Sequence, residues 1–156
     1  NKDLNISDLI FRSVEIKNEV VLKDPKEKNI RKILNFGHTL GHAIESFYLE
    51  SEEKENLTHG EAIAIGMILA TFISRELLHF DKDKQTAITA LVLKHFKKKP
   101  FSTRDIDAII GLLKFDKKNR GDDVLFVLLE DFGKFKINQK VSNELIYSAF
   151  MYYQDF

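Results

Sequence analysis

Two histidines four residues apart are the clearest sign of chemistry in this sequence. His38 and His42 lie in the segment 37–42, which reads GHTLGH. On a helix this spacing places both imidazoles on one face, one turn apart, and neutral imidazole is the commonest protein ligand for zinc. The pattern indicates a candidate metal site, although it also fits two histidines that only satisfy hydrogen bonds within the fold.

Of the three remaining histidines, His59 has the surroundings that best suit a ligand. It stands at a predicted helix start, next to Gly60, and would supply a third imidazole. His79 and His95 lie near predicted helix C-terminal ends, among lysines or apolar neighbours. For these two residues a structural role is favoured.

Two glycines flank the histidine pair at the same spacing of four. Gly37 and Gly41 each cost about 1 kcal/mol of helix stability relative to alanine, but together they leave a shallow groove where another backbone or a ligand can approach. The zinc-protease motif is excluded, because Thr39 rather than glutamate follows the first histidine.

Polar residues also precede the histidines. Arg31 and Asn35 are four residues apart, and Asn35 lies three residues before His38. If one helix is continuous over residues 27–49, these residues and His42 form one polar stripe. Such a stripe suits an anionic ligand, because arginine grips a carboxylate or phosphate through two hydrogen bonds and asparagine binds hydroxyls. An ordinary solvent-facing side of a helix would show the same pattern.

The elements that must position these residues are mostly helices. The chain of 156 residues contains only two prolines and seven glycines, which favours long helices. Hydrophobic spacing and capping signals predict helices over residues 7–23, 27–49, 59–78, 84–97, 103–115 and 142–153. The capping signals are a capping box of Thr58 and Glu61 and a cap at Ser142, and the helix over residues 59–78 is predicted to be the buried central one. Polar loops are predicted over residues 50–56 and 116–123, and a β-hairpin over 124–129 and 134–137, joined by a turn at residues 131–133. The predicted fold is a mainly α, multi-helix bundle with one short β-hairpin.

The composition argues against several classes of function. Lys plus Arg and Asp plus Glu both number 24, so the net charge is near zero, which disfavours binding to nucleic acid or membranes. There is no cysteine, which excludes disulfides and thiolate zinc sites. No apolar run approaches the roughly 20 residues of a membrane span. We expect a single cytoplasmic domain, trimmed from a larger protein because no methionine starts the chain.

Longer segments resemble the 3-dehydroquinate synthases. The family signature is similar to residues 31–45, RKILNFGHTLGHAIE, and to residues 59–67, HGEAIAIGM. Lys17 and Asp24 match upstream of the signature, and residues 115–118, FDKK, match downstream. The resemblance extends over nearly the whole chain. It implies a dehydroquinate-synthase-like α domain, the C-terminal metal- and substrate-binding domain of that enzyme, over residues 1–156.

The resemblance implies a role for each matched residue. His38 and His59 correspond to metal ligands, for Zn²⁺ or Co²⁺, and His42 would be a catalytic residue beside them. The substrate-binding residues that it implies are Lys17, Arg31 and Asn35, which also count as catalytic, joined by Lys117 or Lys118. These types suit a substrate with both a carboxylate and a phosphate.

The family implied is a lyase of the shikimate pathway, which leads to the aromatic amino acids. It converts 3-deoxy-arabino-heptulosonate 7-phosphate, a phosphorylated seven-carbon sugar acid, to 3-dehydroquinate and phosphate. NAD transiently oxidises a substrate hydroxyl, phosphate is eliminated, the ketone is reduced again, and the ring opens and recloses by an aldol step. The resemblance implies a homodimer for the full-length enzyme.

The sequence departs from the family pattern in three ways. The family's N-terminal NAD-binding domain is absent, because no glycine-rich strand-to-helix turn is present. The family's third metal ligand, an upstream glutamate, is also missing, and two imidazoles alone leave zinc under-coordinated. We therefore expect the isolated chain to be inactive and to bind zinc weakly. Asn29 replaces a frequent glycine, and we expect it to hold the left-handed backbone of that turn.

Two other readings remain open. A related sugar-phosphate cyclase or a metal-dependent polyol dehydrogenase would share the helical domain and similar histidines. A stand-alone helical binding module would need no catalysis at all. The Arg31 and Asn35 pair and the lysines of residues 116–118 favour the dehydroquinate enzyme, because they suit a phosphorylated acid.

Overall fold

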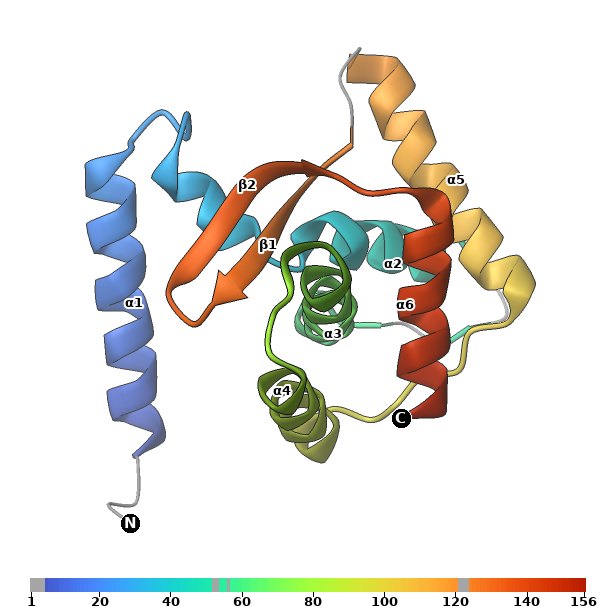
Figure 1. Ribbon diagram of the computed structural model, residues 1–156, viewed down its shortest axis with the longest axis horizontal. Helices are drawn as coiled ribbons and strands as arrows, with labels where there is room; N and C mark the ends of the chain where they lie inside the picture. Colours follow the sequence, from blue (N-terminus) through green and yellow to red (C-terminus); the bar gives the residue numbers. More distant parts are fainter. Residues whose placement is uncertain (1–4, 52–53, 56, 121–123) are drawn as a thin grey trace. The chain divides into compact units, whose positions relative to one another are not determined.

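The structure, a computed structural model, describes residues 5–51, 54–55, 57–120 and 124–156, and only the backbone of residues 114–120. The chain divides into two compact units, Asn1–Leu34 and Asn35–Phe156, and each is described by itself. The described elements are helices and one antiparallel hairpin (Figure 1). The predicted mainly α fold with one short hairpin is therefore confirmed. None of the described helices combines the length and the apolar character that crossing a membrane requires.

The first unit contains helix α1 (Ile6–Lys23), close to the predicted range. After α1 the chain turns around Asp24, whose carboxylate accepts hydrogen bonds from the backbone N–H groups of Lys28, Asn29 and Arg31. The bond from Asn29 is the main reason that the pKa of Asp24 lies below its ordinary value. The expected left-handed backbone at Asn29 is wrong. Glu27 takes the positive φ of 53° in this turn, which frees the N–H of Asn29 for the carboxylate.

The predicted continuous helix over residues 27–49 is also wrong. The chain forms a short 3-10 helix, η1 (Ile30–Asn35), and then helix α2 (His38–Glu50). Gly37 separates them with a φ of 78°, a left-handed conformation that glycine adopts without steric cost. Because no continuous helix carries Arg31, Asn35 and the histidines, the predicted single polar stripe along one helix does not exist.

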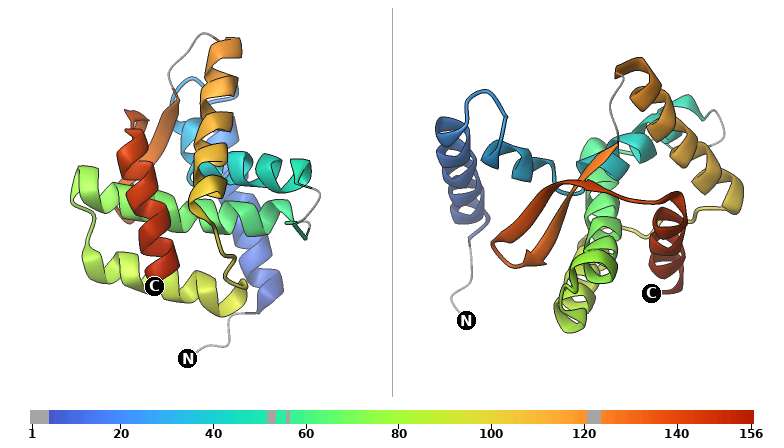
Figure 2. Two further views of the ribbon diagram at one scale, coloured as in Figure 1. Left: turned by 90° about the vertical axis from the view of Figure 1, so that its right-hand side faces the viewer. Right: turned by 45° about the horizontal axis from the view of Figure 1, so that its top comes forward.

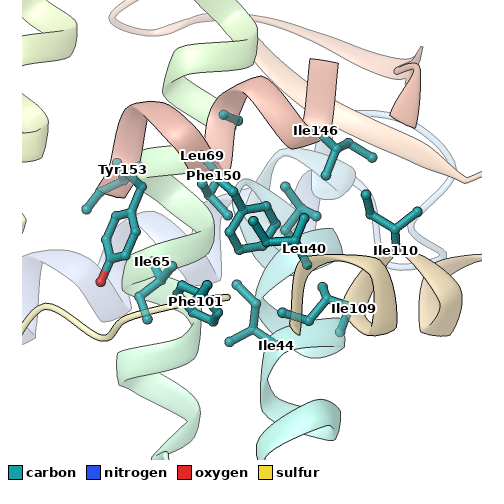
Figure 3. Close-up of a cluster of buried hydrophobic side chains, with 14 of the residues drawn as sticks. Leu40, Ile44, Ile65, Leu69, Phe101, Ile109, Ile110, Ile146, Phe150 and Tyr153 are labelled. Carbon is teal, nitrogen blue, oxygen red and sulfur yellow. The ribbon is translucent and has the colours of Figure 1, made fainter. Parts of the chain in front are cut away.

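The second unit is built around helix α3 (His59–Leu78), the predicted central helix, whose residues 62–66 and 68–71 are all buried. It packs against α2, α4 (Lys82–His95), α6 (Asn143–Asp155) and strand β1 (Leu125–Asp131) (Figure 2). Strand β2 (Lys134–Lys140) pairs with β1, and helix α5 (Thr103–Arg120) packs on α2. The core side chains drawn in Figure 3 interdigitate between α2, α3, α5 and α6.

Element boundaries differ from the predictions mainly at α5. This helix continues to Arg120, so the loop predicted from Asp116 is wrong over its first five residues, which contain no glycine or proline to stop a helix. Helix α4 begins two residues early because Asp81 caps it by accepting the N–H of Lys84. The Thr58–Glu61 capping box and the Ser142 cap are present as predicted.

The contact between α2 and α3 fixes the histidine-bearing segments relative to each other. The two helices run antiparallel, because Gly37 lies against Met67 and Gly41 lies against Ile63. A Cβ atom on Gly41 would lie 3.0 Å from the Cα of Ile63, and one on Gly66 would overlap the carbonyl oxygen of Gly37. The groove predicted between the spaced glycines therefore exists, and another backbone fills it.

The hairpin braces both helices through side-chain hydroxyls. Thr39, in the first turn of α2, donates a hydrogen bond to the carbonyl of Leu125 over 3.2 Å. Ser74 of α3 accepts the N–H of Leu129 over 2.9 Å. Because β1 holds one residue of each helix, the hairpin adds a second constraint on the α2–α3 arrangement.

We predict that Gly66→Ala destabilises the chain by about 3 kcal/mol, the upper range for overpacking a core. The new methyl group would overlap the oxygen of Gly37 and lie 2.8 Å from the nitrogen of Gly41, and neither backbone atom can move without separating the helices. Gly111→Ala is the matched control, because that helical glycine is exposed and has open space around it. Urea unfolding should show this control gaining about 0.5–1 kcal/mol. Equal stability of both variants would contradict the close approach.

A second polar network ties the loop after α2 to the start of α5. Lys54 donates a hydrogen bond of 2.8 Å to Asp105, and Asp105 and Ser102 bond each other's backbone N–H in a capping box. The ammonium of Lys54 also lies 5.3 Å from the ring centroid of Phe47. Burial raises the pKa of Asp105, but the hydrogen bonds from Lys54 and Ser102 outweigh it and hold this pKa below 3.8.

This network should make the free energy of unfolding depend on pH in the acidic range. A lowered carboxyl pKa contributes stability that is present above the ordinary value of 3.8 and is lost as the pH falls below it. We predict that Asp105→Asn lowers the free energy of unfolding by about 1–2 kcal/mol at neutral pH, and that the deficit shrinks in acid. Urea unfolding across pH measures this, with the exposed Asp107→Asn as control. A deficit that does not change with pH would show that the charge of Asp105 is irrelevant.

Candidate metal centre

Three imidazoles meet where α2 and α3 lie side by side. His38 begins α2, His42 follows one turn later, and His59 begins α3. Their ring centroids are 5.4 Å (His38–His42), 5.9 Å (His38–His59) and 5.5 Å (His42–His59) apart. One ring nitrogen from each lies within 4.8 Å of the others, a group that could hold one metal ion. His38 is half-buried, and His42 and His59 are exposed, so the group is open to a small ligand.

Hydrogen bonds orient two of these rings. The Nδ1 atom of His38 lies 3.3 Å from the carbonyl oxygen of Phe36, and the Nδ1 atom of His59 lies 3.0 Å from a carboxylate oxygen of Glu45. Because a carbonyl and a carboxylate oxygen only accept, we assign the proton of both rings to Nδ1. The Nε2 lone pairs of both rings then remain for a metal, the arrangement usual among metal-binding histidines.

His42 differs from its two neighbours. Although His42 as a whole is exposed, neighbouring atoms partly desolvate its ring, and this is the main cause that lowers its pKa. Positive charge on His38 and on His59 lowers the pKa of His42 further, while the carboxylate of Glu45 acts in the opposite direction. The ring of His42 is therefore neutral at neutral pH, and a neutral imidazole can accept a proton at one nitrogen and donate at the other. This property suits a proton-transfer group next to a metal.

The other predicted site residues fall into separate parts of the structure. Asn35 is exposed and belongs, like the histidines, to the second unit. Lys17 is exposed on α1, in the first unit. Arg31, also in the first unit, donates a hydrogen bond of 3.0 Å to the carbonyl of Pro25 and lies 3.8 Å from the carboxylate of Glu27. Lys117 and Lys118 lie on α5, and their side chains are outside the described residues.

Glu45, whose carboxylate contacts His59, is not among the site residues predicted from the sequence. A usable signal was present, because Glu45 lies three residues after His42 and therefore near it on a helix. The hydrogen bond between His38 and the carbonyl of Phe36 had no such sequence signal, since it depends on the turn at Gly37. His79, the left-handed C-cap residue of α3, and His95, the last residue of α4, have the structural positions that were expected.

A separate groove of about 760 Å³ lies between α5 and α6. The described residues that line it include Asp107, Ile110, Tyr147 and Met151, and none of these described residues is a histidine or carries a cationic side chain. The groove therefore does not suit an anionic substrate, and the histidine group is the better candidate for chemistry.

Comparison with known proteins identifies the family of this chain. The model of the 3-dehydroquinate synthase C-terminal family matches residues 1–119. A 3-dehydroquinate synthase of Parabacteroides distasonis is 35% identical over 150 residues, covering 96% of this chain and 42% of that protein. One from Nostoc punctiforme is 39% identical over 142 residues, covering 90% of this chain and 38% of that protein. The chain thus spans about two fifths of the length of these relatives.

Solved structures of related cyclases have the same fold. A 2-deoxy-scyllo-inosose synthase complexed with carbaglucose-6-phosphate, NAD⁺ and Co²⁺ matches with a TM-score of 0.73 at 29% identity, over 92% of this chain and 40% of that one. A 2-epi-5-epi-valiolone synthase from Streptomyces hygroscopicus, with NAD⁺ and Zn²⁺ bound, matches with a TM-score of 0.71 at 20% identity, over 92% and 39%. On the extent of the family match and the identity to its curated relatives, this chain belongs to the 3-dehydroquinate synthase C-terminal family.

Proposed function

We propose that this chain is the metal- and substrate-binding part of a 3-dehydroquinate synthase. In this proposal it acts with an NAD-binding domain to convert 3-deoxy-arabino-heptulosonate 7-phosphate to 3-dehydroquinate and phosphate. The observation that carries the proposal is the convergence of His38, His42 and His59 within the segments that match the family. The chain's coverage of only about two fifths of its relatives supports a need for a further domain.

The donor set of the histidine group fits a zinc or cobalt ion. Both metals accept imidazole nitrogen, and His38 and His59 would hold the ion through Nε2, since their Nδ1 atoms already bond oxygen. Bound zinc would polarise the substrate hydroxyl that is oxidised. Two protein nitrogens leave positions for substrate and for a ligand from outside this chain, which is why we expect the isolated chain to bind zinc weakly.

The other predicted site residues of this chain would bind and orient the substrate. His42, neutral and adjacent to both ligands, would accept or donate a proton at its ring nitrogen. Asn35 would hydrogen-bond substrate hydroxyls, and Lys117 or Lys118 would attract the anionic groups. Lys17 and Arg31 are assigned to substrate binding on the sequence motif alone, because their unit is described by itself.

A second candidate is a related sugar-phosphate cyclase. The similarity to the 2-deoxy-scyllo-inosose synthase, at 29% identity, favours it. The curated relatives from Parabacteroides distasonis and Nostoc punctiforme, at 35% and 39% identity, are both 3-dehydroquinate synthases, which supports the first candidate more strongly. The carbaglucose-6-phosphate in that structure has no carboxylate, whereas the seven-carbon acid has one. A direct comparison of turnover with glucose 6-phosphate and with the seven-carbon acid therefore separates the candidates.

Activity should appear only when an NAD-binding domain is supplied. We predict that a chimera joining the remaining part of the Parabacteroides distasonis relative to this chain releases phosphate and forms 3-dehydroquinate, and that the chain alone does neither. In the chimera, His38→Ala should abolish turnover, because it removes one metal ligand. His95→Ala is the matched control, because His95 is exposed at the end of α4, and should keep full turnover.

Either of two results would defeat this assignment. Formation of 3-dehydroquinate by the chain alone would show that no further domain is needed. A chimera that turns over equally well with His38→Ala would show that the histidine group is not the active centre.

A further inference from the structure

The contact between Glu45 and His59 joins the two helices of the metal centre. Glu45 lies in the third turn of α2, and His59 is the first residue of α3. A carboxylate oxygen of Glu45 is 3.0 Å from Nδ1 of His59. The Glu45 side chain is 26% exposed, whereas that of His59 is 56% exposed. The Glu45 carboxylate is thus the less exposed of the two groups, and its hydrogen bond can fix the orientation of the more exposed His59 ring.

Glu45 does not belong to the group of ligand atoms itself. Among the described residues, the side chains that could share one ion there are His38, His42 and His59. The direct contact of Glu45 with this group is the hydrogen bond to the imidazole of His59, in addition to the charge that it places near His42. A carboxylate on the far nitrogen of a metal-binding histidine fixes its tautomer and orientation and makes it more basic.

The two ligand rings are oriented by different kinds of acceptor. His38 is held by the backbone carbonyl of Phe36, which no substitution of a side chain removes. His59 is held by the side chain of Glu45, which a substitution can remove. The effect of ring orientation on metal binding is therefore open to experiment at His59.

We propose that Glu45 is the positioning residue of this metal centre: its carboxylate holds His59 with the proton on Nδ1 and the Nε2 lone pair directed to the metal. This inference rests on the proposed function for the existence of the metal site. The tautomer of His59 does not depend on a metal, so that half of the proposal can be tested in its absence.

The first test is the tautomer of His59, read from the imidazole nitrogen signals of the metal-free, ¹⁵N-labelled chain by NMR. At mildly alkaline pH the wild-type ring should carry its proton on Nδ1. Glu45→Ala should shift His59 toward Nε2–H, the form that a free imidazole prefers in water. Glu50→Ala, an exposed glutamate at the end of the same helix, should leave the tautomer unchanged. An Nδ1–H ring in Glu45→Ala would overturn the proposal.

The second test is zinc affinity, measured by calorimetry with the metal alone. Glu45→Ala should weaken binding about 10- to 100-fold, the usual cost of losing such an outer partner, and His59→Ala should weaken it more. Glu45→Gln should lie between, because its amide oxygen still accepts the hydrogen bond without the charge. This variant also covers the case in which Glu45→Ala fails to fold.

The two tests separate failure of the inference from failure of the proposed function. Zinc affinity that is unchanged in Glu45→Ala but lost in His59→Ala would refute the positioning role and leave the metal site standing. Zinc affinity that is unchanged in His59→Ala would refute the metal site, and the tautomer comparison would still decide what Glu45 does to the ring.

Discussion

The approach of two helix backbones at glycine is the constraint on which the rest of the second unit depends. Helices normally pack at 8–10 Å because side chains separate them. Here Gly37, Gly41 and Gly66 remove the side chains at the crossing, and a Cβ on any of the three would meet atoms of the other helix. The approach brings the start of α3 to the face of α2 that carries His38 and His42. A helix pair of ordinary spacing would hold the same imidazoles farther apart.

Much of this could be predicted from sequence, because the signals were local. The Thr58–Glu61 capping box gave the start of α3, the turn at residues 131–133 gave the hairpin, and the His38–His42 spacing gave two of the three clustered rings. The break at Gly37 could not be predicted in the same way, because glycine is tolerated in a helix and also adopts a left-handed conformation readily, so the residue type does not decide between the two. Gly37 lies against Met67 of α3, a contact that the local sequence does not reveal. The spacing of Glu45 from His42 indicates that Glu45 lies near the histidines, but its specific partner, His59, is 14 residues away and depends on the packing of α2 and α3.

In the proposed function, the histidine group supplies only part of the metal site. It offers two ring nitrogens for an ion and a neutral imidazole beside them, and the Nε2 atoms of His38 and His59 are directed away from the oxygen partners of these rings. In the proposed function, the nucleotide and a further metal ligand come from outside this chain. When the metal ligands are divided between two domains, both metal binding and enclosure of the substrate depend on assembly of the two domains. A preformed pair of oriented imidazoles lowers the ordering cost of that assembly, because less conformational freedom remains to be lost.

A crystal structure of this chain grown with zinc, with the ion located by anomalous diffraction at the zinc edge, tests the central claim most directly. We predict one ion at the α2–α3 contact, about 2.0–2.1 Å from Nε2 of His38 and from Nε2 of His59, with Glu45 still bonded to Nδ1 of His59. An ion on Nδ1 of either ring, an ion at His79 or His95 instead, or no ion at the cluster at saturating zinc would contradict the account.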